Sequence, residues 1–96
     1  MRRDEALRLL AAHRDEFAAR GADSLSLFGS VARDAAGSDS DVDILIDFTR
    51  SLDLFDLGLI QVRLEEILNE RIDLVLTRVL RPQLRANILA EAIRAT

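Results

Sequence analysis

The sequence comprises 96 residues, 49% hydrophobic and 31% charged, the balance of an ordinary globular protein and enough for one domain over residues 1–96. It has no cysteine, which excludes disulfides and thiolate metal sites and fits a reducing cytoplasm. No apolar run reaches the roughly 18 residues that a membrane span needs. The formal net charge is −4, which disfavours nucleic acid as the main partner, because phosphate binding needs a cationic face.

The first third of the chain predicts one helix, one strand and a short second helix. Apolar residues at helical spacing predict a helix over residues 3–20, and Gly21 is a typical stop after it. Alternation of leucine with serine predicts a strand over 24–28. After a Gly-Ser pair, residues 31–35 are expected to form one or two helical turns, and 37–40 a turn.

The middle of the chain has the clearest periodicities. Residues 41–48 alternate between an apolar face and a face with three aspartates, which predicts a strand. A helix is expected over 54–68, because leucine and isoleucine recur along one stripe. Ser51 or Asp53 is a suitable N-cap, and Asn69 is expected to end the helix.

The last third adds a strand and a helix. Residues 71–77 predict a third strand, and Pro82 fits the first turn of a helix to about residue 94 whose apolar stripe packs on the sheet. The order of elements predicts an α/β fold, with a small mixed sheet of about three strands covered by helices.

Two carboxylates at the start of the middle strand point to a cation. Asp41 and Asp43 are two apart, so both side chains leave the same face, within about 7 Å of each other. Two ionised carboxylates so close raise each other's pKa unless a cation lies between them. Oxygen ligands suit Mg²⁺, with Mn²⁺ an alternative, and no histidine or cysteine lies near to favour zinc.

The Gly29-Ser30 pair is a candidate phosphate site. Glycine lets the backbone approach a ligand closely, and the free N–H groups at a helix start bind anions together with the Ser30 hydroxyl. Arg33 lies one turn later and has the reach to contact the same phosphates. Ser40 is first a turn residue and second a candidate phosphate contact.

Asp73 is a third candidate, because a charge is unexpected in an apolar strand. If its strand pairs beside the strand of Asp41, it completes a cluster of three carboxylates. Such a cluster holds two metal ions about 4 Å apart and assists in-line attack on phosphorus. Asp73 would then position, and help to deprotonate, the attacking hydroxyl.

These motifs resemble the DNA polymerase beta-type nucleotidyltransferase superfamily. Gly29-Ser30 is followed by ten residues, then Asp41-Val42-Asp43 and a later strand aspartate. The fuller form, GSVAR with SDSDVDILI, is similar to the minimal nucleotidyltransferases of prokaryotes, over nearly the whole chain. The sequence departs from the family pattern at Asp34, where many relatives have glycine after the arginine. This difference concerns the conformation of the local turn and not the metal site.

The resemblance implies a partner as well as a chemistry. Minimal nucleotidyltransferases are commonly encoded beside a helical HEPN-domain toxin of ribonuclease type, which they counteract as antitoxins. Some transfer AMP from ATP to a tyrosine of the toxin. The 96 residues leave no room for a separate acceptor-binding domain, so we expect the HEPN partner to supply that half of the site in a hetero-oligomeric complex.

The aspartates and the whole chain each have alternative interpretations. The run Asp39, Asp41 and Asp43 mimics the start of an EF-hand loop, but that loop needs glycine and glutamate where Ile44 and Arg50 stand. A solvated turn without function is the alternative for the aspartates taken alone. For the whole chain, a binding module that neutralises a toxin by occlusion stays open, as does a small-molecule nucleotidyltransferase of the aminoglycoside type.

Overall fold

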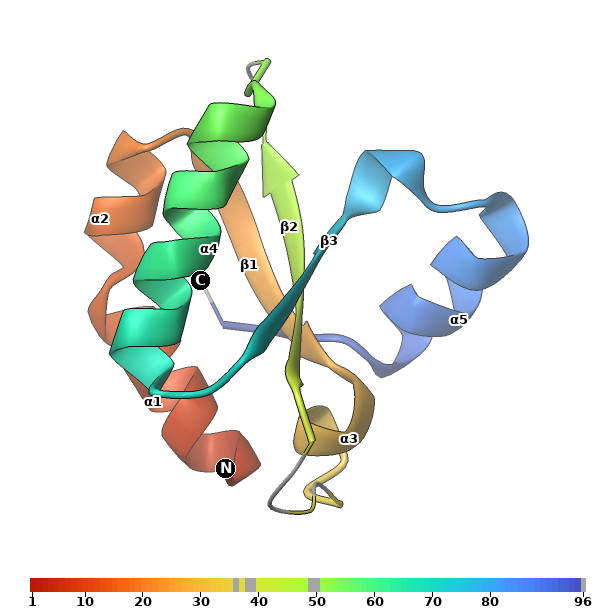
Figure 1. Ribbon diagram of the computed structural model, residues 1–96. Coiled ribbons are helices and arrows are strands. Elements are labelled where there is room, and N and C mark those ends of the chain that lie inside the picture. The colour runs from red at the N-terminus through yellow and green to blue at the C-terminus, as the bar shows by residue number, and fades with distance from the viewer. Residues whose placement is uncertain (36, 38–39, 49–50, 96) are drawn as a thin grey trace.

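The computed structural model describes residues 1–35, 37, 40–48 and 51–95 (Figure 1). In chain order its elements are α1 (Arg3–Ala12), α2 (Arg14–Ala19), β1 (Ala22–Phe28), α3 (Gly29–Ala32), β2 (Val42–Phe48), α4 (Leu54–Leu68), β3 (Ile72–Leu76), the 3₁₀ turn η1 (Thr77–Val79), α5 (Pro82–Glu91) and β4 (Ile93–Arg94). No helix of these described ranges is long and apolar enough to cross a membrane. The α/β fold predicted from the order of elements is confirmed.

The sheet is mixed, with the strand order β3-β2-β1-β4. Strand β1 runs antiparallel to both of its neighbours, β2 and β4. Strands β2 and β3 are parallel, because α4 crosses over between them and returns the chain to the same end of the sheet. The three expected strands are therefore present, and β4 is a fourth that the sequence prediction missed.

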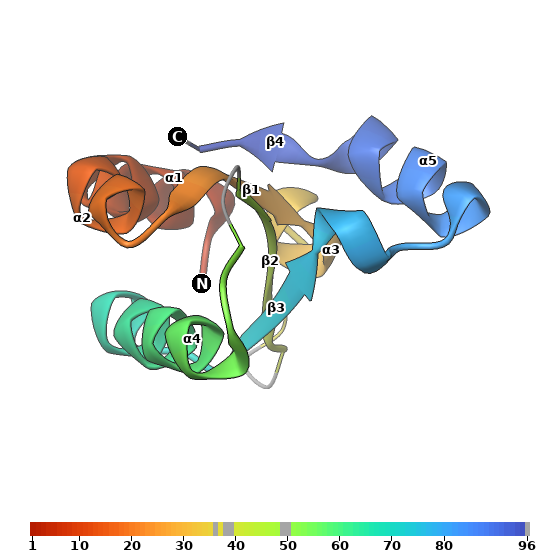
Figure 2. The same ribbon diagram turned by 90° about the horizontal axis from the view of Figure 1, so that it is seen from above.

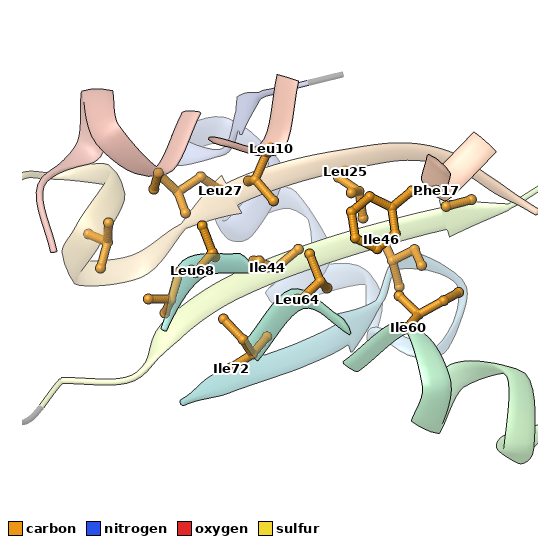
Figure 3. Packing of buried hydrophobic residues seen from close by; sticks show 14 of the residues in the cluster. Leu10, Phe17, Leu25, Leu27, Ile44, Ile46, Ile60, Leu64, Leu68 and Ile72 are labelled. Carbon is orange, nitrogen blue, oxygen red and sulfur yellow. The ribbon is translucent and has the colours of Figure 1, made fainter. Parts of the chain in front are cut away.

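The core lies between one face of the sheet and three helices. Seen from above, α1, α2 and α4 lie on one side of the sheet, and α5 lies on the other (Figure 2). Buried side chains from both layers interdigitate in between, among them Leu10, Phe17, Leu25, Leu27, Ile44, Ile46, Ile60 and Leu64 (Figure 3). Because side chains alternate along β2, its aspartates project from the face opposite this core.

The N-terminal helix is interrupted, which corrects the prediction of one helix over 3–20. The break is at His13, whose φ of −109° and ψ of 17° are not helical. Its ring Nδ1 lies 2.8 Å from the carbonyl oxygen of Leu9, and its own N–H donates to Leu10 three residues back, at 3.2 Å. The side chain thus competes for the carbonyl that the next helical turn would use.

The end of the chain also differs from the prediction. Helix α5 ends at Glu91 instead of continuing to residue 94, and the chain then pairs with β1 as β4. None of the ten residues of α5, all of them described, is buried, and Leu84 and Leu89 are half exposed. The expectation that its apolar stripe packs on the sheet was wrong, because α1, α2 and α4 already cover the apolar face.

Candidate functional site

Two aspartates meet on the face of the sheet opposite the core. In the parallel pairing of β2 with β3, Asp43 stands directly opposite Asp73, so the strand pairing expected from the sequence is confirmed. Burial, and then the negative charge of Asp73 beside it, raise the pKa of Asp43. Such a pair is unfavourable when both groups are ionised, and a bound cation would relieve it.

Asp41 has a different environment. It lies just before β2, and its Oδ1 is 3.2 Å from Nε of Arg71, which lies just before β3. Its charge still contributes to the raised pKa of Asp43, so it lies close to the pair. Among the described residues, no three histidine, cysteine or acidic side chains are gathered in a ready-made metal site. A third metal ligand at Asp41 would have to leave Arg71.

Gly29 brings the Gly-Ser pair against these carboxylates. It follows β1 directly and has a φ of +73°, a conformation that side chains disfavour. A Cβ atom built on Gly29 would lie 2.1 Å from Oδ2 of Asp43, so there is no room for one. The absence of a side chain therefore places the start of α3, with Ser30, next to the aspartate pair.

Arg33 is held at this place by a residue that the sequence reasoning missed. Its Nη1 donates to Oε2 of Glu91 at 3.1 Å, and the Gly29 N–H donates to Oε1 of the same carboxylate at 3.2 Å. The positive charge of Arg33 acts against the other effects on Asp43 and lowers the pKa of that carboxyl. A signal was available, since an acid at the C-terminal end of a helix is disfavoured by the helix dipole.

Ser40 takes part in a turn. Its N–H donates to the Gly37 carbonyl at 3.2 Å, and its Oγ accepts from the Gly37 N–H at 3.1 Å. The turn expected over 37–40 is consistent with these bonds, although Asp39 lies outside the described residues. A phosphate contact of Ser40 stays a prediction.

Asp34 occupies the turn where the family resemblance leads us to expect glycine. Its φ is +58°, the left-handed conformation that glycine adopts at no cost. The carboxylate accepts a hydrogen bond of 3.0 Å from the Arg3 N–H at the start of α1, and lies 3.3 Å from Nη2 of Arg2. The Arg3 bond is the main reason why the pKa of Asp34 is lowered. The departure therefore preserves the turn and ties it to α1.

The fold and the site together define the class of protein: an α/β domain in which two paired aspartates lie beside a helix that begins at a glycine. A site of this class is suited to ligands that carry phosphate. Residues 19–94 match the model of the family described as polymerase beta, nucleotidyltransferase. The chain belongs to this family.

Two curated relatives are similar to this chain over most of their length. The chain is 37% identical over 73 residues to a Methanocaldococcus jannaschii protein named "Putative protein adenylyltransferase MJ0435", covering 76% of this chain and 78% of that protein. It is 36% identical over 86 residues to the protein adenylyltransferase MntA of Thermococcus cleftensis, covering 88% and 87%.

Solved structures share the fold. One, described as the "Structure of putative minimal nucleotidyltransferase", has a TM-score of 0.85 and 38% identity, and the match covers 97% of this chain and 95% of that one. Another is the MNT antitoxin in complex with the tri-AMPylated HEPN toxin of Shewanella oneidensis, with a TM-score of 0.67 and coverages of 94% and 71%. At 18% identity, the second likeness is one of fold alone.

Proposed function

We propose that this protein transfers AMP from ATP to the hydroxyl group of a tyrosine on a HEPN-type toxin, and so acts as its antitoxin. The observation that carries the proposal is the Asp43–Asp73 pair, with Asp43 held against the Gly29 backbone, on the face of the sheet opposite the core. The two relatives support the proposal, because both are named as protein adenylyltransferases, one of them as a putative one. The structure of the MNT antitoxin supports it as well, because the HEPN toxin in that complex carries AMP.

The donor set fits a hard divalent cation, Mg²⁺ or Mn²⁺. Asp43 and Asp73 supply carboxylate oxygens only, and their mutual repulsion is what a cation relieves. We assign Asp41 as a further ligand, freed from Arg71, in a site for two ions. When bound, the metal supplies neutralisation of phosphate charge and polarisation of the phosphoryl oxygens.

The side chains and backbone groups of the protein have separate roles in binding the phosphates and in proton transfer. The Ser30 hydroxyl and the N–H groups at the start of α3 hold phosphate oxygens, and Arg33 adds positive charge beside them. Asp73 orients the acceptor hydroxyl and takes its proton as the oxygen bonds to the α-phosphorus. The bond from the α-phosphorus to the bridging oxygen breaks, and pyrophosphate leaves. We place this reaction in the cytoplasm, where ATP is available.

The direct test is mass measurement of both proteins after incubation of this chain with Mg·ATP and its HEPN partner. Each AMP adds roughly 330 Da to the partner. The partner should lose its ribonuclease activity in step with this modification, and Asp73→Asn should prevent both changes. Transfer to an aminoglycoside instead of the partner would favour the small-molecule alternative.

One observation favours a second candidate, a binding module that blocks the toxin by occlusion. Asp41 and Arg33 are both engaged in ion pairs within the chain, which is how inert groups would appear. That candidate predicts that the complex silences the toxin equally without ATP. It also predicts that Asp73→Asn changes nothing.

A further inference from the structure

Glu91 lies beside the candidate phosphate site because of the sheet register. In the antiparallel pairing of β4 with β1, Ile93 stands opposite Leu27 and Arg94 opposite Ser26. Continuing this register by two steps brings Glu91 alongside Gly29, 62 residues earlier in the chain. Glu91 is the last residue of α5, and the pairing of β4 with β1, which begins two residues later, holds this end of the helix near Gly29.

The contacts of Glu91 leave most of the Arg33 guanidinium free. Both carboxylate oxygens lie near the same nitrogen, Nη1, at 3.3 and 3.1 Å. A guanidinium has five N–H donors in a rigid fork, and those on Nε and Nη2 have no hydrogen-bond partner within the described part of the chain. The Arg33 side chain is 55% exposed, so these donors are accessible to a ligand.

We propose that Glu91 is a positioning residue for nucleotide binding, which holds the guanidinium of Arg33 at the start of α3 with its free donors ready for a phosphate. The inference rests on the proposed function, since it assigns the phosphates of ATP as the ligand. An arginine side chain loses much conformational entropy when it is immobilised, and a pre-formed ion pair removes most of that cost from the binding step.

A competing role for the same contact has the opposite consequence. If the Glu91 carboxylate occupied the place of a phosphate, ATP would have to displace it, and removing its charge would strengthen binding. If Glu91 only stabilised the fold, its removal would lower the melting temperature without changing the affinity of the folded protein for Mg·ATP.

The test is Glu91→Gln, which keeps an oxygen for the Gly29 N–H and removes the charge that holds Arg33. We expect the Kd for Mg·ATP, measured by calorimetry, to rise about fivefold, the upper range for a half-exposed ion pair. The KM for ATP should rise similarly while kcat changes little. In an Arg33→Gln background, Glu91→Gln should have no further effect on Kd, because the two residues act as one unit.

Glu16→Gln is the matched control, because it breaks another arginine–glutamate pair, with Arg63, on the helical side of the sheet. It should leave the Kd for Mg·ATP unchanged.

Unchanged or tighter binding by Glu91→Gln, or full additivity with Arg33→Gln, would overturn the positioning role. A parent protein that binds ATP in this Glu91-dependent way but never modifies its partner would refute only the proposed function. A parent that binds no nucleotide would refute both.

Discussion

At the scale of single residues, glycine at position 29 is required twice over, by its positive φ and by the carboxylate of Asp43 where a Cβ would lie. The conformation and the contact have the same effect: they keep the first N–H of α3 close to the acidic pair. Gly37 and Gly58 differ from Gly29 in the second constraint, since a Cβ added at either of them meets nothing within 4 Å.

Gly29→Ala should therefore lower the free energy of unfolding by about 1–2 kcal/mol, the cost of a left-handed conformation for an ordinary residue. It should also weaken Mg·ATP binding, because Asp43 must move. Denaturant titration and calorimetry measure the two effects. Gly58→Ala is the control at an exposed position of helix α4, and it should raise stability by about 1 kcal/mol without affecting binding. Equal effects of the two substitutions would contradict this account of Gly29.

Asp43→Asn should stabilise the metal-free protein at neutral pH. Because the pKa of Asp43 is raised in the folded state, its ionised form opposes folding, and asparagine carries no charge. The gain should disappear as the pH falls below the ordinary value of 3.8, where the aspartate is protonated in both states. Thermal melts in EDTA across this range measure it.

The same substitution should reduce AMP transfer by a factor on the order of 10³ or more, as expected when electrostatic stabilisation of the transition state is lost. Asp23→Asn, at an exposed position of β1, is the control and should change neither property. Transfer at the parental rate by Asp43→Asn would show that the metal assignment is wrong.

At the scale of elements, an ion pair joins α2 to α4 across the helical layer. Nε of Arg63 lies 2.6 Å from Oε2 of Glu16, and a second bond of 3.1 Å makes the pair bidentate. The hydrogen bond from Arg63 is the main reason why the pKa of Glu16 is lowered. The interrupted N-terminal helix therefore has a polar attachment at its second half as well as the buried Phe17.

This pair predicts a pH dependence of stability. A carboxylate with a lowered pKa in the folded state stabilises the fold above its ordinary value, here 4.5, and loses that contribution as the pH falls through the folded-state pKa. Glu16→Gln should thus lower the melting temperature at neutral pH, and the difference should vanish well below pH 4.5. Glu66→Gln, exposed on α4, should show little effect at either pH. A difference that persists in acid would point to packing instead of charge.

At the scale of the whole molecule, α1, α2 and α4 cover one face of the sheet (Figure 2). The acidic pair of β2 and β3 projects from the opposite face. The binding of a metal at this site would be linked to folding, because the repulsion between Asp43 and Asp73 exists only when β2 and β3 are paired. The unfolded chain has no such site.

Mg²⁺ with ATP should raise the melting temperature more than Mg²⁺ alone. A ligand that binds only the folded state, at about 100 times its Kd, adds about 2.7 kcal/mol of stability. Differential scanning fluorimetry with and without EDTA measures this, and Asp73→Asn should abolish the response. A melting temperature that saturating Mg·ATP does not move would exclude the nucleotide site.

The sequence by itself determined the elements whose signals are local. Helix α4 begins after Asp53, whose side chain caps it, and ends at Asn69 with a φ of +54°, as the residue types predict. The alternation of β2 likewise predicted which face its aspartates occupy. These features depend on residues a few positions apart, so a pattern in the sequence suffices to predict them.

Only the tertiary structure decided the contacts between distant segments. The pairing of Asp43 with Asp73 depends on the parallel register of two strands, and the contact of Glu91 with Gly29 spans 62 residues. Strand β4 has two residues, too few for any periodicity to show, and it exists because β1 offers a free edge. Such pairings are selected by the packing of the whole sheet and its helices, and no local pattern contains that information.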